Sequence, residues 1–328
     1  MKYIEFDNHL RSSYSFALEE YIMTSPDFPD EYFLFWRTHP TLMIGRFQNT
    51  IQEINRRFVE ENNVDVVRRN SGGGTIYTDE NCWQFSFITW KKAGVVKDFR
   101  DFTKPVMDAL EQLGINAEFS GRNDLMAGGK KFSGNAQFGM KDRFLHHGAI
   151  LFDTNLDNLV RSLNVNDEKI ISKGIKSVKE RVTNIKPFLK DTGISGLEFR
   201  DRMIEILKHN METLYLNSDD IKNIEDIERQ KFLTWEWNYG NSPEFNITHS
   251  KRLEGGKVEI QLNVRNGIIN NCSIFGDFFF SGDITSVQNL LIGCRYDKES
   301  IKNVLENVYG SDGFYRISKD DLLSCFFE

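Results

Sequence analysis

Short runs of strand-type residues fill the first ninety residues of the chain and constrain its fold more than any other feature. These runs of aromatic and β-branched side chains lie at Tyr32–Trp36, Thr41–Phe47 and Val64–Val67. Further on, Trp83, Phe85 and Phe87 alternate with smaller or polar residues, which is the period of two of a strand with one apolar face. We therefore expect this part of the chain to build a β-sheet.

Segments with helical spacing of apolar residues separate these strands and return in the second half of the chain. They lie at Ile54–Asn62, Phe99–Leu113, Asn155–Leu163, Leu197–Leu216 and Ile221–Phe232. A glycine-rich stretch at 121–139 leads into an apolar run at 147–152, whereas residues 165–190 are polar and lysine-rich. We expect the last segment to be a long loop, and long ordered loops in compact domains are usually functional. The whole pattern predicts a mixed α/β fold.

A small α+β unit is expected at the C-terminal end. Residues 257–264 and 267–275 alternate like an antiparallel hairpin, and two helical stretches follow. The segment 235–243, rich in turn residues and aromatics, precedes them. A length of 328 residues allows one large domain and one small one. We predict a domain of residues 1–246 and a second of residues 247–328.

Charge and cysteine content narrow the function classes. With 41 Lys and Arg against 48 Asp and Glu, the net charge is −7 and the basic residues form no tract, so we expect no nucleic-acid partner. The first twenty residues mix charges among apolar residues, which predicts neither secretion nor membrane insertion. The four cysteines, which include no CxxC pair, favour a reducing cytoplasm. They are Cys82, Cys272, Cys294 and Cys325.

The first stretch that suggests chemistry is RRNSGGGT at residues 68–75, between two predicted strands. Its three consecutive glycines allow the backbone to approach a ligand closely, and their amides suit an anion or a carboxylate. A tight strand connection with two incidental arginines explains the same residues equally well. The stretch matches neither GxxxxGKS/T nor GxGxxG, so the usual P-loop and Rossmann modes of nucleotide binding are not indicated.

The second stretch runs from Gly121 to Asn135 and contains Asp124, Lys130 and Lys131. A carboxylate is a hard oxygen ligand suited to Mg²⁺, and a lysine is a point charge suited to a phosphate. If the segment is extended, the two lysines point to opposite faces and only one of them serves a given site. A solvated hairpin is the alternative.

The third stretch is the basic segment KGIKSVKERV at residues 173–182, with HHG upstream at residues 146–148. A glycine followed by two lysines and an arginine can fold over an anionic ligand. A solvated surface loop is the simpler alternative.

Taken together, these stretches resemble the lipoate-protein ligase A family. The residues that carry the resemblance are RRNSGGGTIYTD, GRNDL, GKKFSGNAQ, HHGAILFD and KGIKSVKERVTN, in this order. TWEWNYGNSPEF and GGKVEIQLNVRNG extend it into the C-terminal unit. The resemblance implies a catalytic domain of mixed β-sheets flanked by helices, of the kind shared with biotin-protein ligases, plus a small α+β accessory domain.

The resemblance also implies a two-step reaction. Lipoate and Mg-ATP give lipoyl-AMP and pyrophosphate, and the lipoyl group then passes to a lysine ε-amine. The acceptor would be an apo lipoyl domain of a 2-oxoacid dehydrogenase complex or the glycine-cleavage H protein. ATP and Mg²⁺ are therefore the expected cofactors of a monomeric, cytoplasmic enzyme.

Position by position, the resemblance gives Lys131 the contact with the α-phosphate and the acyl carboxyl, where its charge serves both steps. Asn123 and Asp124 would lie at the phosphates, with Asp124 as the Mg²⁺ contact. His147 would lie near the lipoyl chain, although a buried, hydrogen-bonded histidine explains it equally well. The remaining implied binding residues are Arg69, Ser71, Gly72, Gly73 and Gly74 at the acyl and carboxyl end, Gly74, Thr75, Ile76 and Tyr77 along the nucleotide, and Gly174, Ser177, Val178 and Arg181 in an adenylate-binding loop.

One position departs from the family pattern. Some members carry a histidine just before Asp79, where this chain has Thr78. The resemblance therefore implies no histidine role at this position of the chain.

Three alternatives compete with a ligase. An octanoyl or lipoyl transferase needs an accessible thiolate, but no cysteine lies within residues 121–182 and Cys82 falls in an apolar strand, where it is interpreted as a core residue. A non-catalytic lipoate sensor would not need Lys131 and Asp124 together. A biotin ligase would show a Gly-Arg-Gly-Arg type of loop, where this chain has RNSG at residues 69–72.

Overall fold

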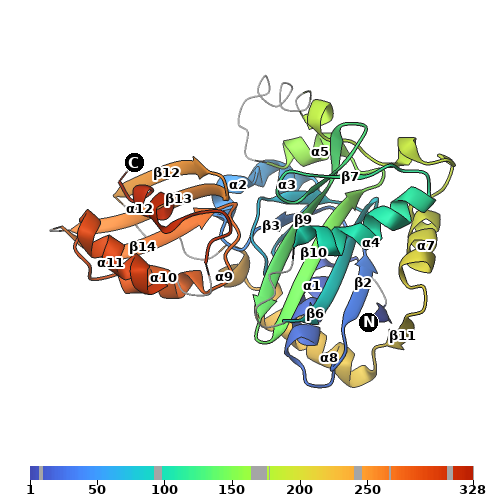
Figure 1. Cartoon of the computed structure of the whole chain (residues 1–328), viewed down its shortest axis with the longest axis horizontal. Coiled ribbons are helices and arrows are strands. Elements are labelled where there is room, and N and C mark those ends of the chain that lie inside the picture. The colour runs from blue at the N-terminus through green and yellow to red at the C-terminus, as the bar shows by residue number, and fades with distance from the viewer. Residues whose placement is uncertain are drawn as a thin grey trace. The chain divides into compact units, whose positions relative to one another are not determined.

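The strand-type runs at residues 32–36 and 83–87 lie in an eight-stranded mixed sheet (Figure 1), whereas those at residues 41–47 and 64–67 contribute to a separate three-stranded sheet. The computed structural model describes residues 1–6, 10–91, 98–163, 176, 178–239, 246–265, 267–308 and 313–327. The chain divides into two units, which we describe separately. The first comprises Met1–Met43, Gln52–Arg68 and Ile76–Asn238, and the second comprises Ile44–Ile51, Arg69–Thr75 and Tyr239–Glu328.

The large sheet has the strand order β11-β1-β2-β6-β10-β9-β8-β7. Strand β1 pairs in parallel with β2 and β11, and the other neighbours are antiparallel. The strands are β1 (Lys2–Glu5), β2 (Tyr32–Trp36), β6 (Cys82–Trp90), β7 (Glu118–Ser120), β8 (Asp124–Ala127), β9 (Lys130–Met140), β10 (Arg143–Leu151) and β11 (Glu212–Tyr215). A second sheet has the order β4-β3-β5, formed by β3 (Thr41–Ile44), β4 (Asp65–Arg68) and β5 (Ile76–Thr78).

Helices cover both faces of the large sheet. The first unit contains α1 (Ser12–Thr24), α3 (Arg56–Glu61), α4 (Phe99–Gln112), α5 (Leu156–Arg161), η1 (Lys186–Phe188), α7 (Gly196–Leu207), α8 (Ser218–Ile227), η2 (Glu228–Phe232) and α9 (Trp235–Asn238), and α2 (Thr50–Glu53) spans both units. Helices α4 and α7 pack together, and α1 packs on α8, η2, β6 and β10.

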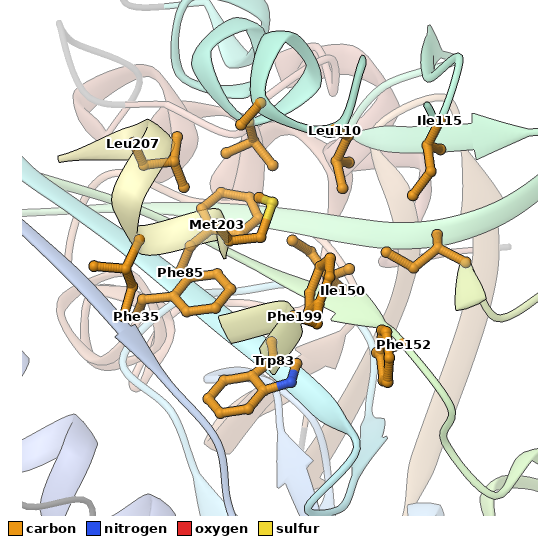
Figure 2. Packing of buried hydrophobic residues seen from close by; sticks show 14 of the residues in the cluster. Phe35, Trp83, Phe85, Leu110, Ile115, Ile150, Phe152, Phe199, Met203 and Leu207 are labelled. Carbon is orange, nitrogen blue, oxygen red and sulfur yellow. The ribbon is translucent and has the colours of Figure 1, made fainter. Parts of the chain in front are cut away.

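The alternation of side chains along the strands distributes them between two cores. In β2, Phe33 and Phe35 join the core with α4 and α7, whereas Leu34 and Trp36 join the core with α1. Figure 2 shows Phe35 and Trp83 in the first of these cores, where their rings stack at 5.4 Å. The period of two predicted from the sequence therefore holds, but both faces of the sheet are buried.

The structure corrects the helix expected over residues 197–216 and adds detail to the loop expected over residues 165–190. The predicted helix over residues 197–216 ends at Leu207, and β11 follows it. Asn210 has a φ of +64°, a left-handed conformation that a continuing helix cannot contain, and β11 then gains a parallel partner in β1. Of the predicted loop over residues 165–190, the described part contains a helical turn at 178–181 and the short helix η1.

The second unit contains the predicted hairpin, whose two strands belong to a three-stranded antiparallel sheet, together with helices. The strand that precedes the hairpin was not predicted. Its elements are β12 (Ile247–Leu253), β13 (Gly256–Arg265), β14 (Ile268–Gly276), α10 (Ile284–Leu291), α11 (Lys298–Val308) and α12 (Lys319–Ser324). Two segments from the first half of the chain belong to this unit. Phe47 stacks on Phe278 at 4.9 Å, and the Gly73 amide donates to the Phe278 carbonyl at 3.2 Å. Among the residues described in either unit, no helix is both long and apolar enough to cross a bilayer.

Candidate active site

The hairpin of β8 and β9 carries the two groups that the sequence assigns to phosphate chemistry. Asp124 begins β8, and Lys131 is the second residue of β9. Leu125 lies opposite Ser133 but Met126 lies opposite Lys131, so Phe132 is an extra residue in β9. Such a bulge re-aims the neighbouring side chains. The Lys131 ammonium consequently lies 2.7 Å from an Asp124 carboxylate oxygen.

This ion pair is partly solvated, because the Lys131 side chain is 40% exposed and that of Asp124 is 32% exposed. A Cβ atom at Gly134 would lie 3.2 Å from Lys131 Nζ, so the glycine leaves room for the ammonium. A partly exposed cation beside a carboxylate, with no bulky neighbour there, is accessible to an anionic ligand.

The two adjacent lysines have different partners. Lys130 Nζ donates to the carbonyl of Lys179 at 2.8 Å, whereas Lys131 pairs with Asp124. The two ammonium groups therefore make different contacts, and the expectation that only one of them serves the site stays a prediction.

The end of the basic segment lies directly against Lys131. Val182 forms a parallel bridge with Lys131, and the Thr183 amide donates to the Lys131 carbonyl at 2.9 Å. Of the four predicted residues of this loop, Val178 is half-buried and Arg181 is exposed, while Gly174 and Ser177 lie outside the described residues. The structure therefore joins two motifs that are about fifty residues apart in sequence.

Asn123 supports the hairpin through reciprocal amide contacts. Its Nδ2 donates to the Asn135 carbonyl, and Asn135 Nδ2 donates to the Asn123 carbonyl at 3.0 Å. Asn135 is buried, and its Oδ1 lies 3.3 Å from Nε2 of His146. Asn123 thus fixes the backbone that presents Asp124.

His147 lies in a buried polar network on the α1 face of the sheet. Its Nδ1 lies 3.1 Å from a carboxylate oxygen of Glu19, which also accepts from Ser86 Oγ at 2.6 Å. The Trp36 indole donates to Ser86 Oγ at 3.1 Å. The second Glu19 oxygen has no hydrogen-bond partner among the residues that the structure describes. Sequence reasoning missed Glu19, whose only signal is a glutamate after the apolar run Phe16–Leu18.

His146, the adjacent histidine, is a core residue. It is fully buried and stacks on Phe102 with ring centroids 4.8 Å apart. Burial, and next the neighbouring His147, lower the pKa of His146 well below its ordinary value of 6.5. His146 is therefore neutral near pH 7 and is not a proton carrier.

The loop of Arg69 to Thr75 belongs to the second unit, and Arg69 holds it together. The buried guanidinium donates to the Gly72 and Gly74 carbonyls at 2.7 and 2.8 Å, and to Ser71 Oγ at 3.1 Å. Thr75 Oγ1 donates to Gln48 at 3.0 Å. The arginine thus organises its own loop, whatever else it binds.

The glycines of this loop have different reasons to be glycine. A Cβ atom at Gly72 would lie 2.3 Å from the Phe278 carbonyl oxygen, and Gly73 has a φ of +90°. At Gly74 the nearest atom, from Asp277, would lie 3.8 Å away. Packing at Gly72 and backbone conformation at Gly73 therefore require glycine, and of the three only Gly74 has the open surroundings that close approach of a ligand needs.

Ile76 and Tyr77 lie in β5 of the first unit. Tyr77 is buried, its hydroxyl accepts from Asn158 Nδ2 at 3.4 Å, and burial raises the Tyr77 pKa to about 12. Ile76 is half-buried.

Cys82 does not offer an accessible thiolate. It is fully buried in β6, its sulfur accepts from Gln84 at 3.3 Å, and burial raises the pKa of its thiol. Cys272 and Cys325 are also buried, and Cys294 is half-buried in the second unit. The interpretation of Cys82 as a core residue is confirmed.

No cluster of three or more His, Cys, Asp or Glu side chains is placed to hold a metal in the described ranges of the chain. A Mg²⁺ ion that binds with a nucleotide needs fewer protein ligands, because it is usually held by one or two carboxylates together with substrate phosphates. Asp124 fits that mode.

Comparisons with known proteins agree with the motifs. The family described as "Lipoyl protein ligase A/B catalytic domain" matches residues 11–208, and "Bacterial lipoate protein ligase C-terminus" matches residues 242–326. The chain is 42% identical to lipoate-protein ligase LplJ of Bacillus subtilis, over the full length of both.

Solved structures show the same fold. A lipoate-protein ligase A bound with ATP is 26% identical, with a TM-score of 0.63 over 73% of this chain and 98% of the other. A bipartite ligase from Thermoplasma acidophilum, studied with its E2 lipoyl domain, is 27% identical, with a TM-score of 0.66 over 75% of this chain and 98% of the other.

Proposed function

The chain belongs to the lipoate-protein ligase family, and from this we propose that it activates lipoate with ATP and attaches the lipoyl group to a protein lysine. The observation that carries the proposal is the Lys131–Asp124 pair, 2.7 Å apart, with the end of the basic segment bridged to Lys131. These groups supply a cation for a phosphate or carboxyl and a hard ligand for Mg²⁺.

In the first step, a carboxylate oxygen of lipoate attacks the α-phosphorus of ATP and pyrophosphate leaves. The Lys131 ammonium would contact the α-phosphate and stabilise the charge that develops there. Asp124 would hold Mg²⁺ together with the nucleotide phosphates, and the ion would neutralise part of their charge.

In the second step, the neutral lysine amine of the acceptor attacks the acyl carbon of lipoyl-AMP. The amide bond forms, AMP leaves, and the amine loses a proton. The Lys131 ammonium would stabilise the negative charge on the acyl oxygen, so that the same preorganised cation serves both steps. The acceptor we propose is an apo lipoyl domain or the glycine-cleavage H protein, and the Thermoplasma acidophilum ligase studied with an E2 lipoyl domain supports the first choice.

The remaining assignments are part of the same proposal. The acyl end would be lined by Arg69, Ser71, Gly72 and Gly73, the nucleotide by Gly74, Thr75, Ile76, Tyr77 and Asn123, the lipoyl chain by His147, and the adenylate by Gly174, Ser177, Val178 and Arg181. Glu19, which contacts His147 at 3.1 Å, joins the lipoyl end. We also propose a catalytic domain of residues 1–246, an accessory domain of residues 247–328, and a monomer in the cytoplasm, where its free cysteines stay reduced.

The test is a reaction with purified components. The chain is incubated with lipoate, ATP, Mg²⁺ and an apo lipoyl domain or apo H protein, and the acceptor mass is measured. We expect one lipoyl group on one lysine, only when ATP is present. Modification from an acyl carrier protein without ATP would instead identify a transferase.

A further inference from the structure

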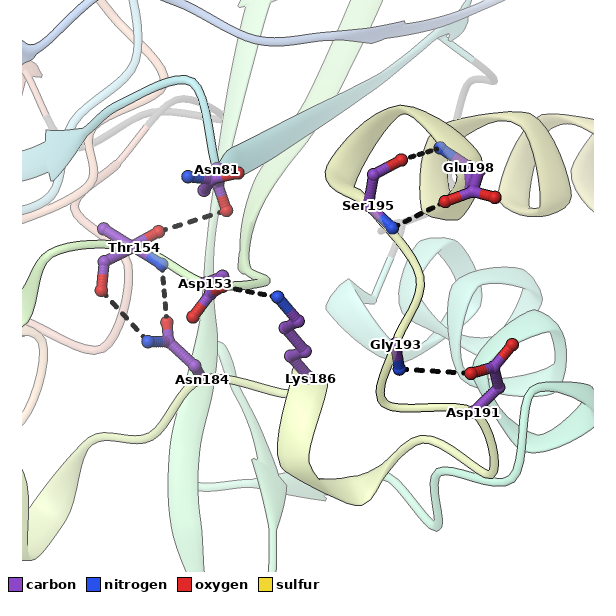
Figure 3. A network of polar contacts seen from close by, with 9 residues as sticks. All are labelled: Asn81, Asp153, Thr154, Asn184, Lys186, Asp191, Gly193, Ser195 and Glu198. Carbon is purple, nitrogen blue, oxygen red and sulfur yellow. Dashed lines mark hydrogen bonds and ion pairs between the residues drawn. The ribbon is translucent and has the colours of Figure 1, made fainter.

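The last residues of three sequence motifs meet in one hydrogen-bonded network of the first unit. Asp79 ends RRNSGGGTIYTD, Asp153 ends HHGAILFD and Asn184 ends KGIKSVKERVTN. Figure 3 shows Thr154 between Asn81 and Asn184, with Asp153 beside Lys186. The proposed function uses none of these residues.

The Asn184 side chain joins its own segment to Thr154, just after β10, through two hydrogen bonds. Its Oδ1 accepts from the Thr154 amide at 3.0 Å, and its Nδ2 donates to the Thr154 carbonyl at 3.0 Å (Figure 3). The next two amides continue the attachment, since those of Ile185 and Lys186 donate to the Leu151 and Phe152 carbonyls at 2.8 and 3.1 Å. Thr154 is 3% exposed, so water cannot easily replace these bonds.

Asp79 fastens a third segment to the same place. One of its carboxylate oxygens accepts from the Asn81 amide at 3.0 Å, and the other accepts from the Asn155 amide at 2.9 Å. The Asn81 carbonyl in turn accepts from Thr154 Oγ1 at 3.3 Å. The turn after β5 and the end of β10 are therefore joined on both sides of Thr154.

The network continues directly into the candidate active site. Thr183, next to Asn184, donates its amide to the Lys131 carbonyl at 2.9 Å, and Val182 bridges Lys131. Asp79 likewise follows β5, which contains Tyr77. Each fastened segment thus leads within a few residues to a group assigned to the adenylate.

We propose that Asp79 and Asn184 are positioning residues that hold the β5 segment and the 178–182 segment in register with Lys131. This inference rests on the proposed function, because its consequence is a correctly shaped lipoyl-adenylate site. Neither residue touches reacting atoms. They act by fixing the backbone, and a displacement of about 1 Å in such a site can cost about a hundredfold in rate.

The test compares Asn184→Ala with Ser195→Ala. Ser195 caps α7 in the same unit, where its Oγ accepts from the Glu198 amide at 3.2 Å and its own amide donates to Glu198 at 2.7 Å (Figure 3). Ser195→Ala therefore also removes a structural hydrogen bond, but that bond lies in a helix cap and does not connect any of the sequence motifs. Both full-length variants are titrated with a non-hydrolysable sulfamoyl analogue of lipoyl-AMP, and their melting temperatures are measured.

We expect Asn184→Ala to weaken binding of the analogue between about tenfold and a hundredfold and to speed hydrogen exchange at the Thr183 amide. Ser195→Ala should lower the melting temperature but leave both readouts unchanged. Asn184→Asp keeps the acceptor for the Thr154 amide but places a carboxylate oxygen against the Thr154 carbonyl. It should also weaken binding, and it is a second test if the alanine variant fails to fold. Asp79→Asn should weaken binding in the same way, and its effect should not add fully to that of Asn184→Asp, because both act on one network.

Unchanged binding in Asn184→Ala or Asn184→Asp, or an equal loss of binding in Ser195→Ala, would overturn the inference and leave the proposed function standing. A wild-type chain that forms no lipoyl-AMP would overturn both.

Discussion

Replacing Lys131 with alanine should abolish most of the activity while leaving the fold intact. The ammonium is 40% exposed and its pair with Asp124 is partly solvated, so its loss should lower the free energy of unfolding by about 1 kcal/mol or less. In the proposed mechanism, the same charge would face the developing charge of the transition state. A preorganised contact of this kind is worth roughly 2.7–4 kcal/mol, which corresponds to a loss of about a hundredfold or more.

The assay is lipoate-dependent release of pyrophosphate, with thermal unfolding measured on the same sample. Lys130→Ala is the matched control, because it removes an adjacent lysine whose ammonium contacts only the Lys179 carbonyl among the partners described. We expect Lys130→Ala to lose little activity. A large loss in Lys130→Ala and a small one in Lys131→Ala would refute the assignment of the two lysines.

Three further predictions follow from the same geometry. Asp124→Asn should shift the Mg²⁺ dependence of adenylation but spare transfer from synthetic lipoyl-AMP, and an unchanged magnesium titration would remove Asp124 from the metal site. Cys82→Ser should remain active with no acyl group on any cysteine, because the native thiol is fully buried, and trapping a thioester on the intact chain would contradict the adenylate route. His146 stays neutral when folded because its pKa is lowered well below 6.5, so below pH 6.5 only the unfolded chain gains that proton. The free energy of unfolding should then fall by up to about 1.4 kcal/mol for each unit by which the pH is lowered below 6.5. An equally steep fall in His146→Gln, measured by denaturant titration, would count against this.

The elements that could be predicted from the sequence are those with a regular spacing of apolar side chains. The residues of β2 and β6 follow the period of two, and α4 has the expected apolar stripe. Helix α1 has almost no polar face, because nearly all of its residues are buried, so it produces no amphipathic pattern. Strand β11 is four residues long and depends on pairing with β1, which is about two hundred residues away.

The candidate site, too, could be predicted from the sequence only in part. Motif order indicated Asp124 and Lys131, but their 2.7 Å contact depends on the bulge at Phe132, which the sequence does not reveal. The contacts of Gly72 and Gly73 with Phe278 are equally invisible, because they join residues about two hundred positions apart. Truncation near residue 246 would also remove Phe278, on which Phe47 stacks. Such a variant would therefore test stability as well as catalysis.

Exchange of labelled pyrophosphate into ATP tests the central claim most directly. In the proposed first step, lipoyl-AMP would form reversibly and without an acceptor. We therefore predict exchange that requires lipoate, needs no acceptor protein and falls about a hundredfold in Lys131→Ala but little in Lys130→Ala. Absence of lipoate-dependent exchange from a folded, full-length chain, together with acyl transfer from a carrier protein, would contradict the account.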